Sequence, residues 1–204
     1  MSERRLAAIM FTDIQGYTSL MQENEKKALE ARDKHRWIFK SITEIHNGRI
    51  LQYYGDGTLS IFDSAIDAVK CAIEMQLGFL KDPAIPVRIG IHTGDIIFSQ
   101  EEIIGDSVNI ASRIESLASA GSVFISEKVY DEIKNQKSIK TQKLRSFKLK
   151  NVEDPVDVYA ISNVGLVVPS PETIDSKSAL DNANLSLKQE QGKSKILTRS
   201  SIII

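Results

Sequence analysis

Six consecutive apolar residues, Leu6–Phe11 (LAAIMF), stand near the start of the chain and are followed at once by polar residues. An apolar run without polar alternation predicts a strand that is buried on both faces. Asp13 and Gly16 come next and predict a turn at the end of that strand. The elements that follow decide which kind of sheet contains it.

Apolar periodicity after the turn predicts a long helix, two short strands, a second helix and a further strand. The short strands flank Gly55-Asp56-Gly57, which indicates a hairpin. This order predicts an α+β fold of the ferredoxin-like (βαββαβ) type, an antiparallel-type sheet with helices packed on it. The expected helices are 19–46, 65–80, 104–117 and 127–135, and the expected strands are 6–11, 49–53, 58–62, 87–98, 122–126, 144–149 and 156–161.

The last fifth of the sequence differs in composition from the rest. No aromatic residue follows Tyr159, and residues 163–195 are rich in Ser, Asn, Gln and Lys. Such a segment buries too little apolar surface to fold. We therefore predict one folded domain at 1–162 and a disordered tail at 163–204. The closing Ile202–Ile204 either docks on a groove or partner, or is a frayed end.

Composition restricts the function classes. The 204 residues are 42% apolar and 26% charged, with a formal net charge of −1. Those values are typical of a soluble globular protein and argue against a nucleic-acid partner, which a basic surface would recruit. Cys71 is the single cysteine and is interpreted as core packing in a reducing compartment. The start of the chain does not resemble a signal peptide, and no apolar run approaches the roughly 20 residues of a membrane span, so a cytoplasmic protein is expected.

Phe11–Thr18, FTDIQGYT, is the first candidate site segment. It places the Asp13 carboxylate at a strand end, beside the backbone amides of Gly16, Tyr17 and Thr18 at a helix start. A carboxylate can hold a divalent metal while such amides contact phosphate oxygens. The alternative interpretation is that Asp13 only caps the helix.

Asp56 lies between two glycines at the hairpin tip, where a backbone without side chains lets a metal approach closely. In a ferredoxin-like sheet the first strand lies beside this hairpin, so Asp13 and Asp56 can share a site for two metals about 3.5–4 Å apart. Two carboxylates suffice for Mg²⁺ or Mn²⁺ when triphosphate oxygens supply other ligands. The alternative is an ordinary turn.

Asn109 and Arg113 form the third candidate, because residues four apart on a helix project from the same face. An amide beside a guanidinium suits a sugar oxygen and a pentavalent phosphate. A solvated polar stripe is the alternative interpretation.

These segments, together with RIGIHTGD at Arg88–Asp95 and in this order, resemble the signature blocks of the class III adenylate/guanylate cyclases. The resemblance covers residues 4–161. It implies a cyclase that works as a head-to-tail homodimer with active sites shared between the chains. It further implies the following roles: metal ligands Asp13, Asp56 and the Ile14 carbonyl; ribose and α-phosphate contacts by Asn109 and Arg113 of the partner chain; a terminal-phosphate contact by Lys150.

Two positions bear on which nucleobase the substrate carries. Adenylate-forming members carry a Lys and an Asp or Thr at positions that are Gln52 and Glu102 here. Either side chain can hydrogen-bond more than one base, and Tyr53 and Tyr54 can narrow the pocket toward a pyrimidine. The expected activity is conversion of a nucleoside triphosphate, ATP first, to a cyclic second messenger with two Mg²⁺ or Mn²⁺ ions. The alternatives are a UTP or CTP cyclase in antiphage signalling, a guanylate cyclase, or an inactive nucleotide-binding homologue.

Overall fold

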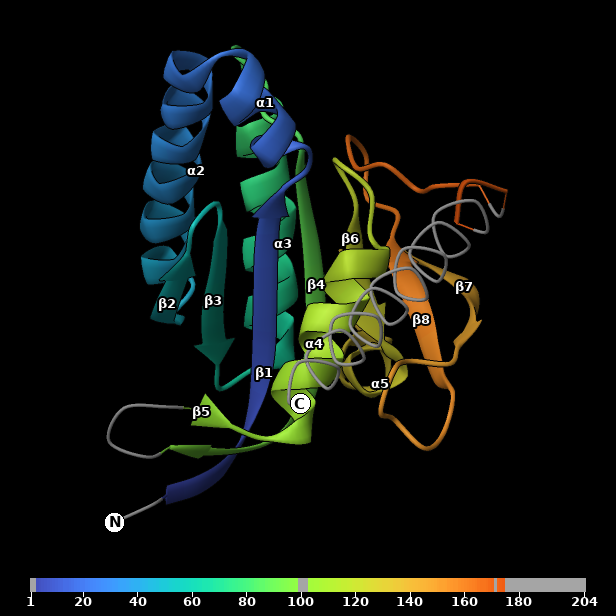
Figure 1. Cartoon of the computed structure of the whole chain (residues 1–204). Helices are drawn as coiled ribbons and strands as arrows, with labels where there is room; N and C mark the ends of the chain where they lie inside the picture. Colours follow the sequence, from blue (N-terminus) through green and yellow to red (C-terminus); the bar gives the residue numbers. More distant parts are fainter. Residues whose placement is uncertain (1–2, 99–102, 171, 175–204) are drawn as a thin grey trace, which may run out of the picture. The chain divides into compact units, whose positions relative to one another are not determined.

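The computed structural model describes residues 3–98, 103–170 and 172–174 (Figure 1). Residues up to Val168 form one compact unit, and the chain from Pro169 on is a separate one, of which residues 172–174 are helical. The helices are α1 Tyr17–Glu23, α2 Glu25–Ile45, α3 Ala65–Phe79, α4 Asp106–Leu117 and α5 Glu127–Ile133. The strands are β1 Glu3–Ile14, β2 Arg49–Tyr54, β3 Gly57–Phe62, β4 Val87–Phe98, β5 Ile103–Ile104, β6 Val123–Ser126, β7 Thr141–Phe147 and β8 Val156–Ile161.

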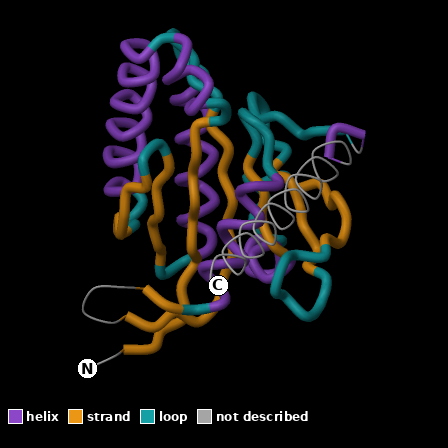
Figure 2. Tube along the Cα trace, viewed as in Figure 1, coloured by secondary structure: helices purple, strands orange, loops and turns teal. Residues whose placement is uncertain are grey.

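All strands belong to one sheet in the order β2-β3-β1-β4-β6-β8-β7, with β5 paired to β4 (Figure 2). Strands β1 to β4 with α2 and α3 have the ferredoxin-like order, and neighbouring strands within this part are antiparallel. The parallel pairing of β4 with β6 attaches the remaining strands. The predicted fold class is confirmed.

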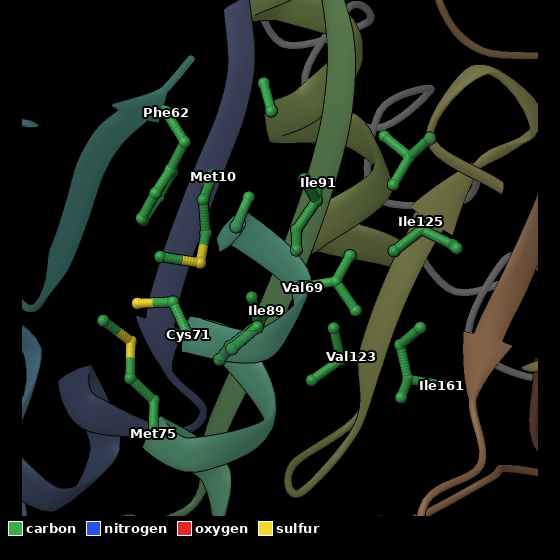
Figure 3. Packing of buried hydrophobic residues seen from close by; sticks show 14 of the residues in the cluster. Met10, Phe62, Val69, Cys71, Met75, Ile89, Ile91, Val123, Ile125 and Ile161 are labelled. Carbon is green, nitrogen blue, oxygen red and sulfur yellow. The ribbon is translucent and has the colours of Figure 1, made fainter. Parts of the chain in front are cut away.

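The central strand β1 is buried on both faces, as the apolar run predicts. Ala8 and Met10 pack in a core cluster with residues of α2, α3 and α5 (Figure 3). Ala7 and Ile9 face the other way, into a smaller cluster that includes Ala111 of α4. Successive side chains of a strand point to opposite faces, so an uninterrupted apolar run is what two covered faces require.

Helix α4 packs on β4 at two glycines of the RIGIHTGD segment. A Cβ at Gly90 would lie 2.1 Å from the backbone nitrogen of Glu115, and one at Gly94 would lie 2.1 Å from Ser107 Oγ. Only glycine leaves room for a helix backbone at that separation. This segment therefore sets the depth at which α4 lies on the sheet.

Several boundaries differ from the sequence-based prediction. β1 extends beyond the predicted 6–11 at both ends, β7 spans Thr141–Phe147 where 144–149 was predicted, and Ile104, predicted as helical, belongs to β5. The predicted helix 19–46 is divided at Asn24, whose backbone (φ −155°) leaves the helical region and whose side chain accepts a hydrogen bond from the Lys27 amide as the cap of α2. At the other end, the compact unit continues to Val168, past the predicted boundary at 162. Val167 donates its amide to the Gly121 carbonyl (2.9 Å), and the Asn163 side chain bonds the backbone at Ser138 and Lys140. Residue 171 and the predicted tail from residue 175 on, Ile202–Ile204 included, lie outside the described residues.

Cys71 is buried in the larger core cluster, in agreement with its interpretation as core packing. No helix in the described ranges combines the length and apolar character that crossing a bilayer requires.

Candidate active site

The structure brings Asp13 and Asp56 together. Asp13 lies at the end of β1, and Asp56 lies in the turn between β2 and β3. Thr12 of β1 pairs with Thr58 of β3 at the end of the β1–β3 ladder. Both carboxylates therefore lie just beyond the residues that pair these two strands. A Cβ at Gly57 would lie 3.1 Å from the Thr12 carbonyl oxygen and 3.5 Å from Asp13 Oδ1. The missing side chain thus lets the turn approach the end of β1.

The two carboxyls share a partly buried region with an excess of negative charge. Burial and, next, the charge of Asp13 raise the pKa of Asp56, and a hydrogen bond between the two side chains acts in the same direction. A carboxylate pair of this kind is not fully neutralised by one arginine, and a divalent cation would supply the remaining positive charge. The donor set consists of hard oxygens, and it fits Mg²⁺ or Mn²⁺ better than a soft metal.

The protein supplies one positive group of its own at this place. Arg88 donates to Asp13 Oδ2 from Nη2 (2.8 Å) and Nε (3.1 Å), and Nε also lies 2.5 Å from Glu115 Oε1. Arg88 was not among the predicted site residues. No local sequence pattern marks it, because Asp13 and Arg88 become direct partners only through the β1–β4 register of the folded sheet.

The turn after Asp13 presents backbone amides, as predicted. Gly16 has φ 80° and caps α1, whose first helical hydrogen bond runs from the Leu20 amide to the Gly16 carbonyl (3.0 Å). The amides of Tyr17 and Thr18 precede that bond, so they have no acceptor within the helix. The Gln15 amide, in contrast, is used by the Pro86 carbonyl (2.7 Å), which anchors the turn to the start of β4.

A pocket of about 380 Å³ opens beside Asp13 on the α4 face of the sheet. Asn109 lines it, whereas Arg113 does not. The Tyr54 ring also lines it and stacks on Phe11, with ring centroids 6.3 Å apart and an interplanar angle of 23°. The full lining is Phe11, Thr12, Asp13, Tyr54, Val108, Asn109, Ser112 and Glu115.

The remaining predicted residues lie elsewhere. Gln52 is exposed on the edge strand β2, two residues before Tyr54. Lys150 is exposed in the β7–β8 connection. Because β4 and β6 are parallel and β8 is antiparallel to β6, this connection lies at the end of the sheet opposite Asp13. Glu102 lies outside the described residues.

Across the residues that the structure describes, His, Cys, Asp and Glu side chains form no metal-binding group of three or more. A metal at Asp13 and Asp56 therefore needs further ligands from the backbone, for which Ile14 is the predicted source, and from the substrate. This is the situation expected for Mg²⁺, which commonly binds through one or two carboxylates and substrate phosphates.

A family model described as the adenylate and guanylate cyclase catalytic domain matches residues 1–163. A putative adenylate cyclase 3 of Rhizobium meliloti is 37% identical over 169 residues, which are 78% of this chain and 28% of that protein. An adenylate cyclase of Anabaena cylindrica is 29% identical over 188 residues, 78% of this chain and 37% of that protein. The chain thus spans about a third of the length of these relatives.

Solved structures show the same fold. An adenylate/guanylate cyclase/hydrolase from Silicibacter pomeroyi superposes with a TM-score of 0.73 at 32% identity, covering 83% of this chain and 100% of that one. The adenylyl cyclase CyaB from P. aeruginosa gives a TM-score of 0.72 at 26% identity, covering 82% of this chain and 100% of that one.

Proposed function

Since the chain belongs to the adenylate and guanylate cyclase catalytic-domain family, we propose that it converts a nucleoside triphosphate to the 3′,5′-cyclic monophosphate and pyrophosphate. The 3′-oxygen loses its proton and bonds to the α-phosphorus, while the bond from that phosphorus to the oxygen bridging to the β-phosphate breaks. The observation that carries the proposal is the approach of Asp13 and Asp56 at the end of the central strand.

Each residue of the site has a role in this proposal. Asp13 and Asp56, with the Ile14 carbonyl, would hold two divalent ions, and these would supply Lewis-acid activation of the attacking oxygen and positive charge for the triphosphate. Arg88 balances the charge of Asp13. The amides of Gly16, Tyr17 and Thr18 meet phosphate oxygens.

The proposed active unit is a homodimer, and the placement of Arg113 and Lys150 supports it, whereas Asn109 lines the pocket beside Asp13 of its own chain. Arg113 is outside the pocket that contains Asp13, and Lys150 is at the opposite end of the sheet. Neither side chain lines the pocket beside Asp13 of its own chain. In a head-to-tail pair, the partner's surface would complete the site, with one side chain for the ribose (Asn109), one for the α-phosphate (Arg113) and one for the terminal phosphates (Lys150).

ATP is the first candidate substrate, because the curated relatives named above are called adenylate cyclases. A pyrimidine triphosphate is the second candidate, and the observation that favours it is Tyr54. Its ring lines the pocket beside Asp13 and Asn109 and is supported by Phe11, which reduces the space for a purine. Gln52 and Glu102 are the proposed base-reading side chains. In either case the product would act as a second messenger.

The test is incubation of the protein and Mn²⁺ with ATP, GTP, CTP and UTP in turn, with identification of the products by mass. We expect one cyclic nucleotide to dominate. Asp56→Asn should reduce its formation to about a hundredth or less, since the loss of one oriented charge at a reacting site costs several kcal/mol. Asp131→Asn, which changes an exposed carboxylate paired with Lys134, is the matched control. Folded wild-type protein that yields no cyclic product from any of the four contradicts the proposal.

A further inference from the structure

A buried polar network lies directly behind the two carboxylates, on the face of the sheet that α2 and α3 cover. Thr12 Oγ1 is 2.8 Å from His35 Nε2 and 2.6 Å from Thr58 Oγ1. The three side chains come from β1, α2 and β3, and each residue is at most 1% exposed. Nothing in the proposed reaction uses them.

The surroundings of His35 are apolar. Its ring stacks on Phe39 and Phe79, with centroid separations of 6.1 and 5.3 Å. Burial and, second, the nearby Arg36 charge lower the pKa of His35 to about 4, so the imidazole is neutral at physiological pH. Within the described part of the chain its Nδ1 atom has no hydrogen-bond partner. An unsatisfied buried nitrogen is costly, so an apolar residue of similar shape would serve simple packing better.

The position of the network explains why a polar group is useful there. Thr12 immediately precedes Asp13, and Thr58 follows the turn that carries Asp56. The hydrogen bonds therefore join Thr12 and Thr58, the last residues that pair β1 with β3, to each other and link Thr12 to His35 of α2. The charge of Asp13 raises the pKa of Asp56, and when both carboxyls are ionised their like charges act to separate the strand ends.

We propose that the Thr12–His35–Thr58 network is a positioning device that holds the ends of β1 and β3 at the separation at which Asp13 and Asp56 bind divalent metal. This inference rests on the proposed function, because it assigns the network to the same metal site. Thr12 and His35 are positioning residues and touch neither metal nor substrate.

The network has a rival explanation, which is that it only fixes α2 on the sheet. The two explanations differ in what the loss of the Thr12 hydroxyl changes. A packing role predicts altered stability with unaltered metal affinity. A positioning role predicts weaker metal binding even where the protein is fully folded.

The experiment titrates metal-free protein with Mn²⁺ alone and follows bound and free ion by electron paramagnetic resonance. Thr12→Val keeps the side-chain shape and removes the hydroxyl. We expect its Mn²⁺ affinity to fall about fivefold or more, the ratio that corresponds to one buried hydrogen bond. Thr12→Ser retains the hydroxyl and should restore most of the affinity. Thr58→Val, which removes the other end of the network, should weaken binding similarly and replaces Thr12→Val if that variant does not fold.

Thr43→Val is the matched control, since Thr43 is a buried threonine of the same helix as His35 and lies beside the Cys71 thiol. It should leave Mn²⁺ affinity unchanged. Wild-type affinity in both Thr12→Val and Thr58→Val overturns the inference, whatever their melting temperatures, and leaves the proposed function standing. If Asp13→Asn combined with Asp56→Asn binds Mn²⁺ as tightly as wild type does, the metal site itself is wrong, and the proposed function fails with the inference.

Discussion

At the end of β1, two adjacent residues have opposite surroundings, one charged and one uncharged. Asp13 faces Arg88 and Glu115 on one side of the sheet, whereas its neighbour Thr12 faces the neutral His35 on the other. Alternation along a strand separates the charged groups from the uncharged network by a single residue. Adjacent positions of β1 thus carry the proposed metal ligand, Asp13, and the proposed positioning residue, Thr12.

Two buried histidines make the stability of the protein depend on pH. Burial is the main cause that lowers the pKa of both His35 and His92 to about 4, against 6.5 in an unfolded chain. Between these values the unfolded state binds more protons, so stability is fully present above pH 6.5 and is lost as pH falls toward 4. From pH 7 to pH 5 each histidine should contribute a loss of about 2 kcal/mol in the free energy of unfolding. Urea unfolding at the two pH values measures this.

His35→Gln should remove about half of that pH dependence, because Gln does not titrate and His92 remains. An unchanged slope between pH 7 and pH 5 in this variant would show that His35 is protonated equally in the folded and unfolded states, contrary to its burial.

At the scale of elements, the contact of α4 with β4 decides where Asn109 lies. Gly90→Ala would place a methyl group 2.1 Å from a backbone nitrogen of the helix, and backbone cannot move aside as a side chain can. We expect a loss of about 1–3 kcal/mol in stability from overpacking. Cyclase activity should fall further than the folded fraction does, since α4 shifts with Asn109. Gly78→Ala, where the nearest side-chain atom would be at 3.4 Å, is the comparison and should be tolerated better.

The sequence predicts helices, strands and turns well where the residue pattern that marks them is local. Strand and helix order follows from periodicity in short windows, and the glycines around Asp56 mark the hairpin. The pairing of Asp13 with Arg88 depends on which strands become neighbours, 75 positions apart, and no local pattern contains that information. The division at Asn24 was missed, although six polar residues at 22–27 (QENEKK) interrupt the apolar pattern there and an Asn cap leaves a recognisable signal.

At the scale of the whole molecule, the proposed shared site predicts complementation. Asp56→Asn and Arg113→Ala proteins should each be inactive as homodimers. A mixed dimer would contain one site with both defects and one with neither, so mixing should restore activity, about a quarter of the wild-type level at equal concentrations with random exchange. Subunit exchange is confirmed separately, for instance by mass spectrometry of differently tagged chains. Exchange without recovery of activity contradicts a site built from two chains.

The sheet order places the proposed metal ligand Asp13 and the proposed base-reading residues in unequal positions. Asp13 ends a central strand paired on both sides, whereas Gln52, Tyr53 and Tyr54 belong to an edge strand whose side chains there are exposed. Substitutions of exposed residues usually change the free energy of unfolding by less than about 0.5 kcal/mol. The proposed base-reading positions on β2 can therefore change with little loss of stability, so a change of substrate base would require no rebuilding of the central strands that carry Asp13.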